Sequence, residues 1–139
     1  EALRLREAGE EYGATTGRPR RCGWLDLPAL RYAVRVNGLD ALVVTKLDVL
    51  DRFEEIRVAE SYDTPQGSGG FPAAGRGLDS VTPRWRTFPG WRTPTVGARR
   101  WSDLPAHARA YLEWIEGACG VPIRSVSVGA KRDAEVSRG

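Results

Sequence analysis

A short apolar run, residues 41–45 (ALVVT), constrains the fold more than any other part of the sequence. A run of this length, rich in β-branched residues, is typical of a buried strand rather than of a helix. Two charged residues, Lys46 and Asp48, follow it closely. Ligands of α/β proteins bind at the carboxyl ends of the strands. The run therefore predicts an α/β fold with a candidate binding site immediately after this strand.

Helices are predicted before and after this strand. Residues 1–11 have the pattern of a helix end that Gly9 terminates. Asp26 is placed to cap a second helix, with Pro28 in its first turn and Gly38 at its end. One face of this helix is apolar and carries Leu27, Leu30, Ala33 and Val34.

A further helix is predicted to begin at the capping residue Asp103 and to end at Gly117 and Gly120. Its apolar face, which we expect to point into the core, carries Leu104, Ala108, Tyr111, Leu112 and Ile115. The only histidine, His107, lies near the start of this helix and is expected on the surface.

Alternating apolar residues from Ile56 to Tyr62 predict a half-buried strand, with residues 84–88 (RWRTF) as its partner. The residues between them, 63–80, are rich in Gly, Pro and Ser and predict a surface excursion of this β-hairpin. Residues 123–128 alternate and predict a last strand, followed by a polar tail. The expected architecture is a mixed sheet with flanking helices.

The composition suits one globular domain spanning residues 1–139, with 41% hydrophobic and 28% charged residues. A net charge of only +3 argues against a nucleic-acid-binding domain. No apolar run is long enough to span a membrane. Cys22 and Cys119 match no metal-ligand spacing, and we expect two small, buried, reduced thiols in a cytoplasmic protein.

The segment Lys46-Leu47-Asp48 is a candidate guanine-recognition motif. Guanine presents two donors, N1–H and N2–H₂, along one edge, and one carboxylate accepts from both; adenine lacks this pattern. The aliphatic stem of Lys46 can lie against the ring while its charged head stays in water. The motif is short, and an ordinary strand end with a capping Asp has the same sequence.

A second candidate site is the loop at residues 13–21 (GATTGRPRR). Its two glycines allow a ligand to approach the backbone closely, its Thr hydroxyls suit a carboxylate, and its Arg side chains suit anions. A third candidate is Ser127-Val128-Gly129, where backbone groups can contact a base or ribose. A solvated basic turn and an ordinary strand end are the corresponding structural alternatives.

Together and in this order, these motifs resemble those of the adenylosuccinate synthetase family. Residues 13–24 (GATTGRPRRCGW) look like its aspartate-binding loop, and residues 45–51 (TKLDVLD) look like its guanine-recognition strand. Shorter matches are PGW at 89–91, DLP at 103–105, GVP at 120–122 and SVG at 127–129. The resemblance identifies the chain as a single C-terminal segment of this P-loop-like α/β fold.

The resemblance implies a GTP-dependent ligase that joins IMP and L-aspartate, uses Mg²⁺ and acts as a homodimer. Residues implied to bind aspartate or IMP are Ala14, Thr15, Thr16, Gly17, Arg18, Pro19 and Arg20. Residues implied to bind GTP are Arg20, Lys46, Leu47, Asp48, Ser127, Val128 and Gly129. Among them, Thr15, Thr16 and Arg20 would touch the aspartate carboxylates. Arg18 would also reach IMP, and Arg20 the GTP ribose.

Two departures from the family pattern bear on function. After Gly129 the family usually has Pro-Asp-Arg, whereas this chain has Ala130-Lys131-Arg132. The resemblance therefore does not predict the geometry of the final turn. No glycine-rich phosphate loop with a lysine is present, and the family's catalytic Asp and His and its Mg²⁺ ligands belong to an N-terminal part.

We therefore expect no catalytic residue and no metal ligand in these 139 residues, and no synthetase activity from them alone. A sheet without its neighbours would also leave an open edge that is prone to association. The alternative reading of the sequence is a stand-alone guanine-nucleotide-binding module without catalytic activity.

Overall fold

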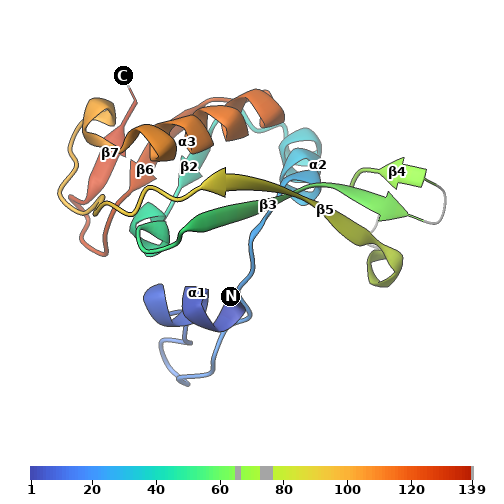
Figure 1. Ribbon diagram of the computed structural model, residues 1–139, viewed down its shortest axis with the longest axis horizontal. Helices are drawn as coiled ribbons and strands as arrows, with labels where there is room; N and C mark the ends of the chain where they lie inside the picture. The colour runs from blue at the N-terminus through green and yellow to red at the C-terminus, as the bar shows by residue number, and fades with distance from the viewer. Residues whose placement is uncertain (65–66, 73–76, 139) are drawn as a thin grey trace.

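The computed structural model describes residues 1–64, 67–72 and 77–138 and contains helices and strands in an α/β arrangement (Figure 1). The α-helices are α1 (Ala2–Ala8), α2 (Leu27–Asn37) and α3 (Ala106–Cys119). The 3₁₀ helices are η1 (Leu47–Leu50), η3 (Leu78–Ser80) and η4 (Trp101–Asp103). The strands are β1 (Leu25–Asp26), β2 (Leu42–Val44), β3 (Glu55–Thr64), β4 (Gly67–Gly69), β5 (Thr82–Pro89), β6 (Ile123–Ser127) and β7 (Glu135–Ser137).

The described strands form two mixed sheets, where the sequence predicted one. In the first sheet β3 is parallel to β1 and antiparallel to β4 and β5. In the second sheet β6 lies between β2, which is parallel to it, and β7, which is antiparallel. Within the described strands neither β1 nor β2 has a second partner, so the two parallel edges do not join into one sheet.

The predicted hairpin is present and longer than expected. Strands β3 and β5 pair from Glu55 with Pro89 to Asp63 with Thr82, with an irregularity in register between Ala59 and Ser61. The hairpin reaches well beyond the rest of the molecule, and β4 lies at its far end (Figure 1). Of the predicted excursion, residues 65–66 and 73–76 lie outside the described residues.

Helix α2 begins and ends where its local sequence predicts. The carboxylate of Asp26 accepts a 3.0 Å hydrogen bond from the backbone N–H of Ala29, and Pro28 occupies the first turn. Gly38 adopts the left-handed conformation, with φ of 58°, and its N–H bonds to the carbonyl of Val34. The helix therefore needs no distant contact to fix its length.

The predicted start of α3 is wrong. Asp103 instead caps η4, because its carboxylate accepts from the backbone N–H groups of Arg99 and Arg100 at 3.1 and 3.0 Å. A residue before proline is disfavoured in helical conformation, so the helix cannot begin before Pro105. It also continues through Gly117, and Gly120 ends it with φ of 74°.

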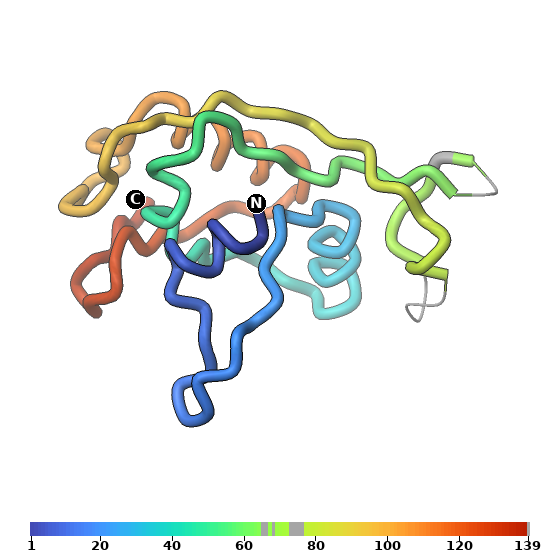
Figure 2. Tube along the Cα trace, turned by 60° about the horizontal axis from the view of Figure 1, so that its bottom comes forward, coloured from blue at the N-terminus to red at the C-terminus, as the bar shows by residue number. Residues whose placement is uncertain are grey.

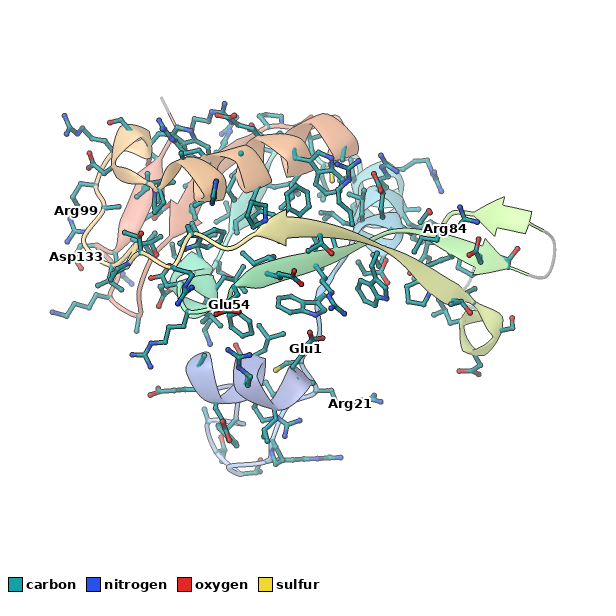
Figure 3. The ribbon with its side chains drawn as sticks, viewed as in Figure 1. Glu1, Arg21, Glu54, Arg84, Arg99 and Asp133 are labelled. Carbon is teal, nitrogen blue, oxygen red and sulfur yellow. The ribbon has the colours of Figure 1, made fainter. Side chains whose placement is uncertain are left out.

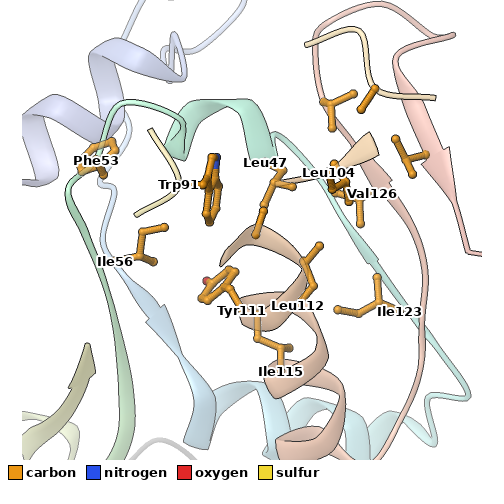
Figure 4. Packing of buried hydrophobic residues seen from close by; sticks show 14 of the residues in the cluster. Leu47, Phe53, Ile56, Trp91, Leu104, Tyr111, Leu112, Ile115, Ile123 and Val126 are labelled. Atoms are coloured by element: carbon orange, nitrogen blue, oxygen red, sulfur yellow. The ribbon is translucent and has the colours of Figure 1, made fainter. Parts of the chain in front are cut away.

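The core lies between the two sheets and α3 (Figure 4). The predicted apolar face of α3 is buried, and Tyr111 and Leu112 pack near Trp91 of the loop after β5 and Leu47 of η1. Cys22 and Cys119, which were predicted to be buried, are unpaired and half-buried against this core.

Two further predictions about strands need correction. The run at 41–45 does form β2, but Val43 is 63% exposed, because side chains alternate along a strand and Val43 points away from the face on which Leu42 and Val44 pack against the core. The tail after Gly129 was predicted to be merely polar, yet it returns as β7. The tail carries two buried apolar residues, Ala134 and Val136, and Val136 is fully buried where β7 pairs with β6.

Helix α1 lies against the body of the molecule, and its residue Leu5 is buried in the core. In Figure 2 the loop that follows α1 projects from the body and returns to it near β1. The side chain of Arg21 is exposed and extends from the part of the loop that leads back to β1 (Figure 3). Across the described ranges, no helix has the length and apolar character needed to cross a membrane.

Candidate functional site

Lys46 stands at the carboxyl end of β2 in an unusual backbone conformation. Its φ of 60° and ψ of 42° lie in the left-handed region, which costs a non-glycine residue roughly 1–2 kcal/mol. Its backbone N–H donates a 2.8 Å hydrogen bond to the hydroxyl of Ser127 at the end of β6. Strain of this kind persists where surrounding contacts hold it, and it is common at binding sites.

The ammonium group of Lys46 is held at the end of α1. Its Nζ donates to the carbonyl oxygen of Gly9 at 2.7 Å and to Oε1 of Glu11 at 2.5 Å. The other oxygen of Glu11 accepts from Nη1 of Arg20 at 2.8 Å. Hydrogen bonds from Lys46 and then from Arg20 lower the pKa of the Glu11 carboxyl. With its head fixed, Lys46 presents its aliphatic stem to the space beside it.

That space is a pocket of about 560 Å³, which we call the base pocket. Its lining residues are Ala8, Gly9, Glu10, Thr45, Lys46, Asp48, Val49, Ser127, Gly129 and Ala130. The structure therefore brings together Lys46, Asp48, Ser127 and Gly129, which come from two sequence motifs about 80 residues apart. The other two predicted residues of these motifs, Leu47 and Val128, have fully buried side chains and can reach a ligand only through their backbone.

Asp48 has an unsatisfied carboxylate. Its Oδ1 is shielded from water and has no hydrogen-bond partner among the described residues. Burial, with a smaller contribution from the charge of Asp51, raises the pKa of Asp48; its own backbone N–H and Lys46 act in the opposite direction. A buried acceptor without a donor costs roughly 1–3 kcal/mol, so a donor brought to this oxygen would remove that cost.

The loop at residues 13–21 is closed by its own backbone. The N–H of Gly13 donates to the carbonyl of Arg18, and the N–H of Gly17 donates to the carbonyl of Gly13, both at 2.8 Å. Gly17 has φ of 63°, which few other residues adopt without strain. An isolated bridge pairs Tyr12 with Pro19. The loop is thus an ordered structure that leaves its side chains in solvent.

Among residues 14–20, which are predicted to bind substrates, only Arg20 reaches the rest of the site. It lines a second pocket, of about 470 Å³, together with Glu11, Lys46 and Trp24, and the neighbouring Arg21 lines the same pocket. The remaining predicted residues are wholly or largely exposed and line neither pocket: Ala14, Thr15, Thr16, Gly17, Arg18 and Pro19. They are free to contact molecules that approach from outside.

Comparison with known proteins identifies the family. Residues 1–136 match the family model of adenylosuccinate synthetase. The chain belongs to the adenylosuccinate synthetase family. It is 52% identical over 134 residues to the adenylosuccinate synthetase of Aquifex aeolicus, covering 96% of this chain and 31% of that protein. It is also 52% identical over 136 residues to that of Sorangium cellulosum, covering 97% and 31%.

A solved structure agrees with this assignment. The fully ligated adenylosuccinate synthetase of Plasmodium falciparum matches with a TM-score of 0.92 and 35% identity, over 99% of this chain and 34% of that one. The predicted family and its α/β fold are therefore confirmed. The chain spans about a third of the length of the relatives it matches. Adenylosuccinate synthetases are ligases of purine nucleotide biosynthesis.

The departure from the family pattern after Gly129 does not disrupt the final turn. The N–H of Val128 donates to the carbonyl of Ala134 at 2.8 Å, and the N–H of Ala134 donates to the carbonyl of Lys131 at 3.0 Å. Strand β7 then pairs with β6 in register. Ala130 lines the base pocket, so the substitution changes the surface of that pocket while the turn remains closed.

Sequence reasoning missed Glu11 and the carbonyl of Gly9. The pattern of residues 1–11 indicates only a helix end, and the sole sequence signal for Glu11 is its position two residues before the loop. For the Mg²⁺ that the family implies, the described residues offer no group of three His, Cys, Asp or Glu side chains able to hold an ion.

Proposed function

We propose that this chain supplies the guanine-reading and aspartate-holding groups of a GTP-dependent ligase that joins IMP to L-aspartate. The observation that carries the proposal is the buried, unpartnered carboxylate oxygen of Asp48 beside the base pocket. Guanine is the purine base whose edge offers the two adjacent donors that one carboxylate can accept. Binding of the base would satisfy a group that is otherwise left without a partner.

The other residues of the base pocket fit the same ligand. The stem of Lys46 would cover one face of the base, because its ammonium is already held by Gly9 and Glu11. Ser127 fixes the backbone of Lys46, and the backbone at Val128 and Gly129 would border the base opposite β2. Leu47 would contribute through its backbone, since its side chain belongs to the core.

The loop at residues 13–21 would hold the amino-acid substrate. Thr15 and Thr16 are exposed hydroxyls that would donate to the aspartate carboxylates, and Arg20 would pair with a carboxylate or with the GTP ribose. Arg18, also exposed, would reach the IMP side. The ordered backbone of the loop lowers the entropy that would be lost when these side chains bind.

The chemistry requires groups beyond these 139 residues. In the proposed reaction GTP phosphorylates the purine O6 of IMP, and the amine of aspartate then displaces the phosphate. Mg²⁺ would neutralise charge on the phosphates, and its ligands would belong to the rest of the synthetase. The residues of this chain bind and orient substrates, so we propose that the chain alone is inactive. A homodimeric complete enzyme is part of the proposal.

The proposal also includes a cytoplasmic location. Cys22 and Cys119 are free thiols that touch the core, and unpaired thiols of this kind are typical of a reducing compartment.

The test is a chimeric synthetase in which this chain replaces the matching third of the Aquifex aeolicus protein. With IMP, GTP, aspartate and magnesium we expect adenylosuccinate formation, and we expect Asp48→Ala to abolish the use of GTP. An equivalent change at an exposed acid of the hairpin, Asp79→Ala, is the control and should leave activity unchanged. An inactive chimera that is folded would contradict the proposal.

The isolated chain tests the alternative of a binding module. We expect it to show neither synthetase activity nor tight GTP binding, because it has no cradle for the phosphates. Adding the remaining part of the Aquifex aeolicus protein should restore activity. Tight GTP binding by the chain alone, with no activity after complementation, would favour the binding module.

A further inference from the structure

Glu11 connects the two halves of the candidate site, which are the base pocket and the loop at residues 13–21. Its Oε1 accepts from Nζ of Lys46 at 2.5 Å, and its Oε2 accepts from Nη1 of Arg20 at 2.8 Å. Lys46 belongs to the base pocket, and Arg20 ends the ligand-bearing part of the loop at residues 13–21. One carboxylate therefore holds one cation from each half.

The backbone around Glu11 is fixed as well. Its N–H donates to the carbonyl of Arg6 in α1, and its carbonyl accepts from the N–H of Arg20, both at 2.9 Å. The carbonyl of Arg20 in turn accepts from Nε of Arg6 at 2.7 Å. These bonds tie the end of α1 to both ends of the loop, so the carboxylate of Glu11 has little freedom to follow one cation away from the other.

The positions of the Arg20 and Lys46 side chains depend on the negative charge of Glu11. Without Glu11, two positive side chains would lie within a few ångströms of a common point and repel each other. With Glu11, both are drawn into charge-assisted hydrogen bonds, which are shorter and stronger than neutral ones. The guanidinium of Arg20 carries five donors, so the bond from Nη1 leaves donors on Nε and Nη2 for a ligand.

We propose that Glu11 is a positioning residue that sets Arg20 and Lys46 in one arrangement and thereby couples nucleotide binding to amino-acid binding. The inference rests on the proposed function, because it assigns Lys46 to the base and Arg20 to the amino acid or ribose. Guanine that packs against the stem of Lys46 fixes the carboxylate through Oε1. The carboxylate then fixes Arg20 through Oε2, and the coupling works equally in the reverse direction.

The experiment uses the chimeric synthetase with Glu11→Gln, which keeps the size of the side chain and removes its charge. We expect the KM for GTP and the KM for aspartate each to rise about tenfold, the loss typical of a removed charged hydrogen bond. We expect kcat to change by less than about threefold, since Glu11 touches no reacting atom. Glu55→Gln, at an exposed acid outside both pockets, is the matched control and should change neither KM.

Two further variants separate positioning from a purely structural role. Glu11→Asp keeps the charge but is one methylene shorter, so we expect partial rescue of both KM values. Combining Glu11→Gln with Lys46→Met should raise the KM for GTP no further than the larger single effect, because both changes break the same contact.

The outcomes are distinguishable. A lower unfolding temperature with both KM values unchanged would show that Glu11 only stabilises the fold, and a rise in one KM alone would show that it does not couple the two halves. Either result would overturn the proposal while the parent chimera stays active. A folded but inactive parent chimera would overturn the proposed function, and with it the site that Glu11 positions.

Discussion

The backbone N–H of Lys46 donates to the hydroxyl of Ser127, and this bond joins the carboxyl ends of β2 and β6 across 81 positions of sequence. Lys46, the donor, is in the left-handed conformation. Ser127 therefore acts on the base pocket through the position of Lys46, in addition to any contact that it makes itself.

Replacing Ser127 by Ala should weaken both stability and nucleotide binding. We expect the free energy of unfolding to fall by about 1 kcal/mol, the usual contribution of one hydrogen bond. In the chimeric synthetase we expect the KM for GTP to rise several-fold, with the KM for aspartate nearly unchanged. Ser102→Ala, at an exposed position in η4, is the control. A stability loss without any change in the KM for GTP would count against this role of Ser127.

Replacing Asp48 by Asn should change which base is accepted. An amide offers one acceptor and one donor, so its N–H₂ would face the N2–H₂ of guanine, and two donors cannot pair. Xanthine carries a carbonyl oxygen at that position and would pair with the amide. We expect the KM for GTP to rise roughly 100-fold and XTP to become the better substrate. Steady-state kinetics with both nucleotides measure this, and equal losses for both would rule out base reading by Asp48.

The same substitution should stabilise the chain in a pH-dependent way. Burial raises the pKa of Asp48 in the folded state, so the folded chain binds its proton more tightly than the unfolded chain does. Stability is then lost as the pH rises from the ordinary Asp value towards the raised one. We expect Asp48→Asn to match the wild type below about pH 3.5, near the unperturbed value, and to be the more stable protein at pH 7. Urea unfolding at several pH values measures the difference.

Asp51, three residues further on, is the matched control for this experiment. Its carboxylate accepts from Nε1 of Trp91 and the backbone N–H of Thr95, both at 2.7 Å, and also from the hydroxyl of Thr95. Asp51→Asn removes one acceptor from a satisfied group and should destabilise by roughly 1–3 kcal/mol. If both Asn variants were destabilised alike at pH 7, Asp48 would not be an unsatisfied acid.

The sequence predicted those features that depend on neighbouring residues. Helix α2 has its cap at Asp26 and its end at Gly38, both recognisable in one short stretch. The start of α3 was misplaced because Asp103 and Pro105 give competing local signals, and only the folded η4 shows which prevails.

Features that depend on contacts between distant residues could not be predicted from local sequence patterns. The bond between Glu11 and Lys46 spans 35 positions, and no periodicity or cap marks it. The exposure of Val43 likewise depends on which elements cover the two faces of β2, and only the face of Leu42 and Val44 packs against the core. The binding roles of the loop at residues 13–21 rest on the family resemblance. Its backbone geometry shows an ordered basic loop and does not by itself identify a ligand.

The open edge of β2 should make the isolated chain associate. Val43 is 63% exposed, and the side of β2 away from β6 has no partner among the described strands. Unpaired N–H and C=O groups beside an apolar side chain favour pairing between copies. We expect sedimentation to show concentration-dependent association, and Val43→Lys to abolish it by placing a charge on the edge. Because Val43 is exposed, its replacement should change stability by no more than about 0.5 kcal/mol.

The control for the edge is Val96→Lys, since Val96 is 65% exposed but lies in a loop outside the strands. It removes as much exposed apolar surface as Val43→Lys and leaves the edge of β2 unchanged. We expect this variant to associate as the wild type does. If Val96→Lys abolished association and Val43→Lys did not, the loop rather than the edge of β2 would be the contact between copies.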